Sequence, residues 1–220
     1  MLTIKRVFFL YFKFANDHAF EVSFSEVDNV CEDNYFYYDN QKNLLLQMHF
    51  HTPSEHTIGG GHAAAELHLV HKNAVTGGLL VLGILINEVT SDGDVDSQGN
   101  DFFKHFLDVA EAEHEAERSN AIYSHEYKVT DAPSLNVYDE ILPASREFYT
   151  YKGSLTTPPC SENVRWIVFA EDVKISSVDL QKLKQSVAEY PYTQTFKEFG
   201  YSSNRPVKEL NDRKVYKYQG

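Results

Sequence analysis

The chain has 220 residues, of which 42% are hydrophobic and 24% charged, so it has enough apolar surface for a folded core and is not a disordered chain. Its formal net charge of −12 is spread along the sequence, which argues against nucleic acid or an anionic membrane surface as a partner. No apolar run approaches the roughly 20 residues of a membrane-spanning helix, and no linker or repeat divides residues 1–220, so we expect a single soluble domain.

Strand patterns dominate the N-terminal part of the sequence. A basic pair followed by an apolar run over residues 5–12 has the outline of a signal peptide. However, Lys13 interrupts the run and no small-residue cleavage site follows, so an ordinary strand is favoured. Polar and apolar residues alternate over residues 20–24 and again over 44–51, as expected for strands with one buried face.

The remaining elements are one more strand and two helices. The apolar run 78–86 predicts a buried strand. A helix capped by Asn100 or Asp101 is expected next, and a second helix is expected to begin after Ser176 or Ser177. Their apolar positions are Phe103, Phe106, Leu107 and Ala110 in the first helix and Leu180, Leu183 and Val187 in the second.

Two histidines alternate on the strand expected at residues 44–51. Side chains two residues apart share a strand face, so Gln47, His49 and His51 project to one side and Leu46, Met48 and Phe50 to the other. An isolated pair of this kind is more often two half-exposed polar residues than a metal site. The neighbouring Gln47, which can accept a ring N–H and orient a ligand, favours the metal interpretation.

A third histidine follows with the same geometry. Glu66 and His68 share one face of the run 65–69, and the leucines of that run share the other. Segment 52–63 is rich in turn-forming residues and would return the chain, so that the two strands pair antiparallel. His68 would then lie beside the first two histidines, and three neutral imidazoles with an open fourth position are the ligand set of a hydrolytic zinc site.

Two further sites near these strands are less specific. Glu55 and His56 follow the first histidine pair and could supply a fourth ligand, form a hydrogen-bonded structural pair or lie at the surface. His71 falls on the leucine-bearing face of its strand, where we expect a hydrogen-bonded core histidine rather than a ligand.

Four segments in this order resemble the α-class carbonic anhydrase family, and shorter matches at 15–20, 81–84, 164–168 and 204–206 extend the resemblance over nearly the whole chain. The four are Gln47-Met48-His49-Phe50-His51, Ser54-Glu55-His56-Thr57, Ala64-Ala65-Glu66-Leu67-His68-Leu69-Val70-His71 and Tyr151-Lys152-Gly153-Ser154-Leu155-Thr156-Thr157-Pro158-Pro159-Cys160. The resemblance implies a mainly β fold of the α+β class, with a large, twisted, mostly antiparallel central sheet and a few short helices. It also implies a zinc lyase that interconverts carbon dioxide and bicarbonate.

The resemblance assigns the metal ligands and the residues that orient them. His49, His51 and His68 match the family's Zn²⁺ ligands, while Gln47 and Glu66 match the residues that hold those ligands in place. These assignments agree with the separate argument from strand periodicity.

The resemblance also assigns residues around the reacting atoms. Thr156 matches the threonine that accepts a hydrogen bond from zinc-bound hydroxide and donates one to a glutamate, here Glu55. The resemblance matches His18 to the family's proton shuttle, a role that an imidazole with a pKa near 6.5 can fill at neutral pH. Without the resemblance, the remaining apolar matches would be read as ordinary core residues. In the family, carbon dioxide rests against an apolar wall, and the residues that match this wall are Val70, Val81, Leu155, Val164 and Trp166. Thr157 matches a residue near the family's bicarbonate site.

Two features depart from the family pattern. The family normally has a few dozen residues before the strand that contains His18, so the resemblance predicts a domain without that N-terminal segment. Cys160 matches a cysteine found mainly in secreted or periplasmic members, which favours such a compartment. Cys31 does not match the usual partner of that cysteine, so a Cys31–Cys160 disulfide is left as an open alternative.

Two other functions compete with the zinc lyase. The spacing of His49, His51 and Glu55 fits the first metal motif of a cupin, but no glycine precedes it at the expected place and no second motif follows. A non-catalytic binding module derived from a carbonic anhydrase is the other alternative, and the absence of the family's N-terminal segment is what supports it.

Overall fold

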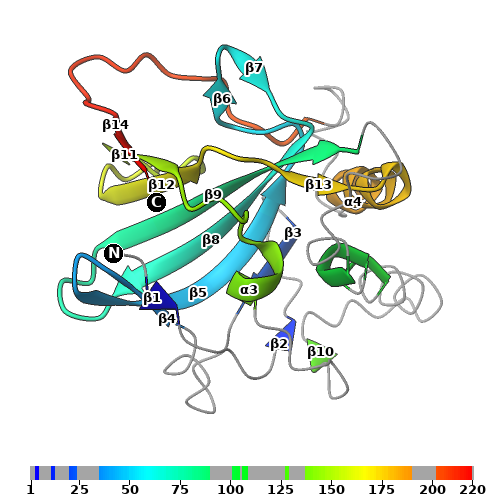
Figure 1. The fold of residues 1–220 in the computed structure, drawn as a ribbon, viewed down its shortest axis with the longest axis horizontal. Coiled ribbons are helices and arrows are strands. Elements are labelled where there is room, and N and C mark those ends of the chain that lie inside the picture. Colours follow the sequence, from blue (N-terminus) through cyan, green and yellow to red (C-terminus); the bar gives the residue numbers. More distant parts are fainter. Residues whose placement is uncertain are drawn as a thin grey trace.

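One large sheet of ten strands organises the described part of the chain (Figure 1). The structure is a computed structural model and describes residues 3–4, 11–12, 20–23, 35–89, 101–104, 106–108, 127–128, 137–189 and 202–219. Neighbouring strands of the sheet are β1 (Thr3–Ile4), β4 (Tyr35–Tyr38), β5 (Gln41–His51), β8 (Ala65–Asn73), β9 (Leu79–Glu88), β12 (Val164–Phe169), β11 (Phe148–Gly153) and β14 (Tyr216–Tyr218). In addition, β3 (Phe20–Ser23) pairs with β5, and β13 (Val173–Ile175) pairs with β9.

The sheet is mixed but mostly antiparallel, as expected. Its parallel pairings are those that β12 and β13 make with β9, and the other pairings are antiparallel. Two small sheets lie apart from it, one of β2 (Tyr11–Phe12) with β10 (Tyr127–Lys128), and one of β6 (Thr57–Ile58) with β7 (Gly61–His62). The predicted strands at 20–24, 44–51, 65–69 and 78–86 are all found, at β3, β5, β8 and β9.

Helices account for a small part of the described residues. They are α3 (Val137–Ile141), α4 (Ser177–Glu189) and the helical residues 101–104 and 106–108, which fall where the first helix was predicted. Ser176 caps α4 as expected, because its Oγ accepts a hydrogen bond from the backbone N–H of Asp179 at 3.1 Å. No helix in the described ranges combines the length and apolar character that a bilayer crossing requires.

The turn-rich segment 52–63 contains more structure than predicted. Its tip forms the β6–β7 hairpin, in which Thr57 pairs with His62 and Ile58 with Gly61. Gly59 and Gly60 occupy the two turn positions at φ values of 62° and 82°, a conformation that glycine adopts without the steric cost of a Cβ atom. The four residues that pair are too few for strand alternation to reveal them.

A β-bulge in β5 corrects one expectation about which leucine is buried. The register with β8 shifts between Leu45 and Gln47, so one extra residue is accommodated at Leu46. The side-chain alternation changes phase there, because a bulge displaces every residue before it to the opposite face. Leu45 therefore joins the core with no exposed surface, whereas Leu46, predicted to share the core face with Met48, is only half-buried.

The two faces of the central strands pack against different partners. On one face, leucine, isoleucine and phenylalanine side chains of β5, β8, β9 and β12 form the main core with side chains from α3, α4 and the helical residues 101–104 and 106–108. On the other face of β8, β9 and β12, a smaller cluster contains Val70, Val81, Val164, Trp166 and Val168. The histidines that were predicted to bind metal project on this second face, away from the helices.

His71 lies on the core face, as predicted. The residue has no exposed surface, its Nε2 is 2.7 Å from the Tyr138 hydroxyl, and its ring meets Phe36 edge-on with centroids 4.7 Å apart. Burial lowers the pKa of His71 to about 3. The side chain is therefore a neutral core histidine.

This lowered pKa predicts a pH-dependent loss of stability. His71 takes up a proton in the unfolded chain below pH 6.5 but stays neutral in the fold down to about pH 3, so protonation favours unfolding in that interval. We expect His71→Gln, which keeps a polar group for Tyr138 but does not titrate, to reduce the slope of unfolding free energy against pH between 6.5 and 4 by up to about 1.4 kcal/mol per pH unit. Urea unfolding at several pH values measures the slope, and His62→Gln at an exposed histidine is the control. A wild-type slope in His71→Gln would contradict the assignment.

Candidate metal centre

Three histidines meet where β5 pairs with β8. The antiparallel register places His49 directly opposite His68 and His51 opposite Glu66. The ring centroids of His49 and His68 are 4.9 Å apart, and those of His51 and His68 are 4.8 Å apart. Because His51 and His68 each expose only 1% of their surface, a metal held there would be largely shielded from bulk water. The predicted approach of His68 to the first two histidines is confirmed.

One nitrogen of each ring is engaged by a neighbour, which leaves the other nitrogen facing the common centre. His49 Nδ1 donates to Gln47 Oε1 at 2.7 Å, and His68 Nε2 donates to Glu66 Oε1 at 2.9 Å. His51 Nδ1 donates to the backbone carbonyl of Ser203 at 2.9 Å. Gln47 and Glu66 were predicted for this role, whereas the Ser203 carbonyl was missed, because a backbone oxygen 152 residues away leaves no sequence signal.

The nitrogens that remain fit a metal ion. One potential ligand atom from each of His49, His51 and His68 lies within 4.8 Å of the others. His51 Nε2 is buried and has no hydrogen-bond partner among the described residues, and such an orphaned atom is costly unless something binds it. The set of three imidazole nitrogens is one that zinc accepts.

Burial keeps two of the rings, those of His49 and His51, in the neutral form that binds metal. Burial lowers the pKa of His49 well below its usual value, and repulsion from His51 and His68 lowers it further. Burial also lowers the pKa of His51, although the nearby Glu55 carboxylate opposes that shift. Lone pairs on these nitrogens are therefore available at neutral pH.

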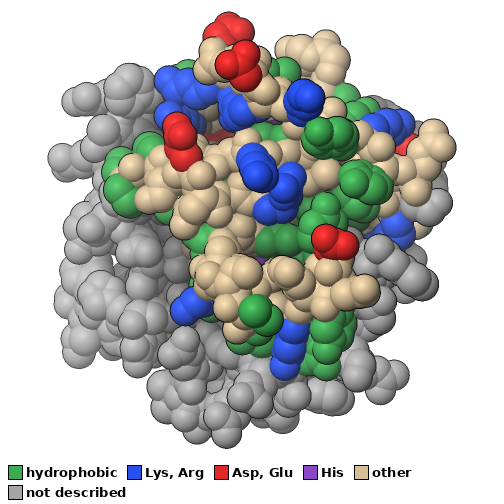
Figure 2. All heavy atoms as spheres, turned by 90° about the vertical axis from the view of Figure 1, so that its left-hand side faces the viewer, with side chains coloured by type: hydrophobic (Ala, Val, Ile, Leu, Met, Phe, Trp, Pro, Cys, Tyr) green, Lys and Arg blue, Asp and Glu red, His purple; other side chains and the backbone are tan. Residues whose placement is uncertain are grey.

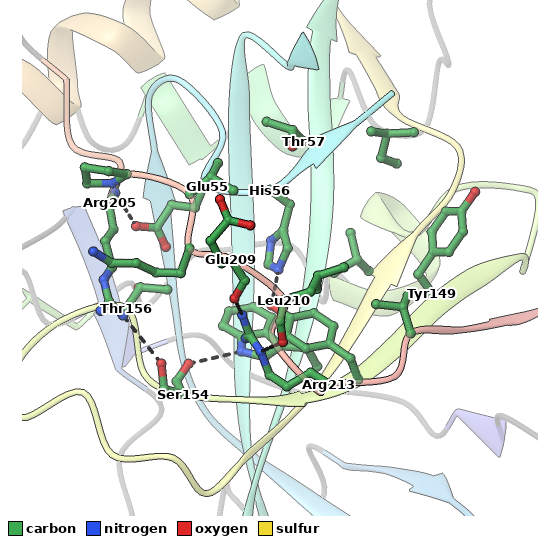
Figure 3. Close-up of a pocket in the computed structure, with 18 of the residues that line it drawn as sticks. Glu55, His56, Thr57, Tyr149, Ser154, Thr156, Arg205, Glu209, Leu210 and Arg213 are labelled. Carbon is green, nitrogen blue, oxygen red and sulfur yellow. Dashed lines mark hydrogen bonds between the residues drawn. The ribbon is translucent and has the colours of Figure 1, made fainter. Parts of the chain in front are cut away.

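Glu55 lies beside the three histidines. Its Oε1 accepts a hydrogen bond from the Arg205 backbone N–H at 2.7 Å, and its Oε2 is 3.5 Å from His51 Nε2. Oε2 has no hydrogen-bond partner in the part of the chain that the structure describes, so the expected bond from Thr156 is not formed here. Glu55 and Thr156 nevertheless line the same cavity of about 690 Å³ (Figure 3).

That cavity is bounded by strands of the second sheet face and by the C-terminal segment. Lys and Arg side chains stand out on the face of the molecule drawn in Figure 2, in spite of the negative net charge. Three basic residues of the C-terminal segment line the cavity, namely Arg205, Lys208 and Arg213. The opening is therefore locally more basic than the chain as a whole.

The structure brings five of the six residues predicted to contact substrate into one apolar cluster. Val70, Val81, Val164 and Trp166 are buried together, and Leu155 packs against them. Thr157 lies outside this cluster, in a turn where its carbonyl accepts from the Cys160 backbone N–H at 2.9 Å.

Other predictions concern residues beyond the cluster. His18 and Cys31 lie outside the described residues, so their predicted roles stay predictions. Cys160 has a free thiol.

Three roles were open for His56, namely a fourth ligand, a hydrogen-bonded structural residue or a surface residue, and the structure shows the hydrogen-bonded one. Its Nδ1 donates to Glu66 Oε1 at 2.6 Å, and its Nε2 lies 2.7 Å from the Tyr151 hydroxyl. Burial by itself would lower the pKa of His56, but the charge and hydrogen bond of Glu66 reverse the effect and raise that pKa. The same pairing with His56, helped by His68, holds the pKa of Glu66 well below its usual value although burial opposes the shift.

Gly83 leaves the space that the Glu66 carboxylate occupies. It lies opposite His68 in the register of β8 with β9. A Cβ atom at this position would be 2.8 Å from Glu66 Oε1, closer than two such atoms can approach. A residue with a side chain would therefore displace a fully buried carboxylate from its hydrogen bonds.

We expect Gly83→Ala to lower the unfolding free energy by about 1–3 kcal/mol, the usual cost of overpacking a buried site. Urea unfolding measures the loss. Gly61→Ala is the matched control, because the nearest heavy atom to its added Cβ would be 3.9 Å away. Equal stability of the two variants would show that Glu66 can move at little cost.

Comparisons with known proteins agree with this arrangement. The family model described as eukaryotic-type carbonic anhydrase matches residues 14–219. A carbonic anhydrase from Nostoc sp. is 35% identical over 195 residues, which are 85% of this chain and 58% of that protein. One from Klebsiella pneumoniae is 33% identical and matches 78% of this chain and 56% of that protein. The chain thus spans somewhat more than half the length of these curated relatives.

Solved structures extend the likeness to the fold. The α-carbonic anhydrase from Thermovibrio ammonificans, solved with the inhibitor sulfanilamide, has a TM-score of 0.68 at 30% identity and covers 97% of this chain and 77% of its own. A carbonic anhydrase from Chlamydomonas reinhardtii, solved with acetazolamide, has a TM-score of 0.70 at 28% identity and covers 98% and 81%. With the family match, this agreement shows that the cupin alternative is wrong.

Proposed function

The chain belongs to the eukaryotic-type carbonic anhydrase family, and we propose that it is a zinc lyase that hydrates carbon dioxide reversibly to bicarbonate and a proton. The observation that carries the proposal is the convergence of three imidazoles, each oriented by a separate acceptor, beside an apolar cluster and a cavity. Each of those features has a use in this reaction.

His49, His51 and His68 would hold the metal through His49 Nε2, His51 Nε2 and His68 Nδ1, the nitrogens that Gln47, Ser203 and Glu66 do not engage. Of these, His49 Nε2 and His68 Nδ1 lie 3.1 Å apart. Zinc in an open three-histidine site lowers the pKa of a bound water to about 7 and so supplies a nucleophile at neutral pH, and carbonic anhydrase is itself the standard example of this chemistry. The protein's part is to orient the three rings and to favour the neutral form that binds metal. Hydrogen bonds to Gln47, Ser203 and Glu66 orient the rings, and burial lowers the pKa of His49 and of His51.

We assign Thr156 and Glu55 to the orientation of the attacking oxygen. An ionised carboxylate only accepts hydrogen bonds, and Glu55 Oε1 is already occupied by the Arg205 N–H. A threonine hydroxyl that donates to the free Oε2 must then accept at its own oxygen. Thr156 would therefore accept an O–H from the nucleophile and leave a lone pair directed at the substrate carbon, which is catalysis by orientation.

The apolar cluster suits a substrate without charge. Carbon dioxide gains little from polar contacts, so a wall formed by Val70, Val81, Leu155, Val164 and Trp166 can receive it without leaving buried polar groups unpaired. Thr157 is assigned to the neighbourhood of bicarbonate, and His18 to proton export, both on the family resemblance.

A non-catalytic binding module is the second candidate. What favours it is that the chain spans 58% and 56% of the two curated relatives described above, so the activity of the whole proteins need not transfer. The retention of all three histidines and of their acceptors favours the enzyme instead.

Stopped-flow hydration of carbon dioxide distinguishes the two candidates. We expect zinc-loaded protein to accelerate hydration well above the buffer rate and metal-stripped protein to lose this activity. His68→Ala should lose zinc, because two imidazoles remain where three are needed. Folded, zinc-bearing protein with no rate above buffer would establish the binding module, and full zinc content in His68→Ala would contradict the ligand assignment.

A second substitution tests orientation separately from metal binding. We expect Thr156→Val to keep one equivalent of zinc while the hydration rate falls by about 100-fold, because a misoriented nucleophile costs a factor of this order. Metal analysis and stopped flow on the same sample measure both quantities. Thr157→Val is the matched control, and it should retain more activity than Thr156→Val. Wild-type activity in Thr156→Val would remove Thr156 from the mechanism.

A further inference from the structure

We infer that His56 and Tyr151 are positioning residues of the metal centre, which act by fixing Glu66 and through it the ring of His68. The inference rests on the proposed function, because it takes His68 to be a zinc ligand. Neither residue faces the three ligand nitrogens, so each would act through the residues between.

A continuous line of hydrogen bonds joins Tyr151 to His68. The Tyr151 hydroxyl on β11 is 2.7 Å from His56 Nε2, and His56 Nδ1 is 2.6 Å from Glu66 Oε1. The same Oε1 accepts from His68 Nε2 at 2.9 Å. These hydrogen bonds therefore connect the wall of the cavity to His68 Nε2, the ring nitrogen that is not assigned to the metal.

Glu66 also accepts hydrogen bonds from groups outside the series that joins Tyr151 to His68. Its Oε2 accepts hydrogen bonds from the backbone N–H groups of Glu55 at 2.9 Å and His56 at 2.8 Å. With His56 Nδ1 and His68 Nε2 on Oε1, the carboxylate accepts four hydrogen bonds and has no exposed surface. A buried carboxylate is stable only when it is hydrogen-bonded in this way, so loss of the His56 side chain would free half of its contacts on Oε1.

The orientation of Glu66 determines which nitrogen of His68 is available to metal. An ionised carboxylate accepts, so His68 must carry its proton on Nε2, and the lone pair is then on Nδ1. If Glu66 turned, this preference and the angle of the ring would both weaken. Outer partners of this kind commonly change metal affinity by 10- to 100-fold.

Contacts with its neighbours fix the His56 ring, so the ring can hold Glu66 in one orientation. Its ring meets Trp166 with centroids 4.8 Å apart, and the Tyr151 hydroxyl holds its far nitrogen. A Cβ atom at Gly83 would be 2.8 Å from Glu66 Oε1 and 3.8 Å from His56 Nδ1, so the glycine leaves room for their hydrogen bond. The ring therefore has one position in which both of its nitrogens are bonded.

A second metal ion is the competing explanation for this cluster, because His56, Glu66 and His68 also bring three potential ligand atoms together. The separations of 2.6 Å and 2.9 Å are those of hydrogen bonds between the atoms themselves, with no room for an ion between them. The cluster is therefore a support for one metal and not a second site.

The test is zinc affinity, measured by competition with a chelator, together with the visible spectrum of the cobalt-substituted protein as a report of coordination geometry. We expect His56→Leu to weaken zinc binding by about tenfold or more and to alter the cobalt spectrum. His56→Asn keeps an N–H near the place of Nδ1 and should recover most of the loss. Tyr151→Phe should weaken binding by a smaller factor, whereas Tyr149→Phe, which makes the same change on the same cavity wall, should not.

Each other outcome overturns the inference. Wild-type affinity and spectrum in His56→Leu would show that Glu66 needs no support, and equal losses in His56→Leu and His56→Asn would show that shape matters and the hydrogen bond does not. Two equivalents of zinc in the wild type, with one lost in His56→Leu, would establish the second metal site. If His56→Leu fails to fold, His56→Asn and the tyrosine pair decide. Wild-type protein that binds no zinc would refute the proposed function itself, which is a distinguishable result.

Discussion

The antiparallel pairing of β5 with β8 is the constraint on which the site depends. His49 comes to lie opposite His68 only in this register, and a shift by one residue would turn the histidines of one strand toward the helices. The bulge at Leu46 absorbs the one residue that would otherwise put Leu45 out of the core. The same hydrogen bonds that build the centre of the sheet therefore also set the geometry of the three histidines that could hold a metal.

The second constraint is a buried negative charge. Glu66 has no exposed surface, so its carboxylate has lost its hydration. Four hydrogen bonds offset this cost, two from backbone N–H groups and two from the imidazoles of His56 and His68. Burial and pairing act in opposite directions on the pKa of Glu66, and pairing prevails. Gly83 contributes as well, because a Cβ atom at this position would be 2.8 Å from Glu66 Oε1. The candidate metal site therefore depends on residues that would not contact the metal.

The two faces of the sheet have different roles, because one packs the main hydrophobic core and the other carries the candidate site. The face covered by α3, α4 and residues 101–104 and 106–108 is mostly apolar, and burial keeps its His71 neutral. The opposite face holds the three histidines that could bind a metal and, in the next strands, the cluster around Trp166. Because the sheet is anchored by its core face, the other face can keep a buried nitrogen such as His51 Nε2 without a hydrogen-bond partner among the described residues. That arrangement is what a rigid metal site with an open position requires.

By itself, the sequence determined every feature that follows from the local period of a strand or helix. Alternation placed Gln47, His49 and His51 on one face, paired Glu66 with His68, assigned His71 to the core, and located the buried strand β9 and the helix α4. Tertiary structure alone decided the partners that are distant in the chain. These are the Ser203 carbonyl on His51, the Arg205 N–H on Glu55 and the Tyr151 hydroxyl on His56, together with the bulge that exchanged Leu46 for Leu45. The physical reason is that side-chain period is a property of neighbouring residues, whereas backbone groups are the same at nearly every position and acquire a partner only when the chain has folded.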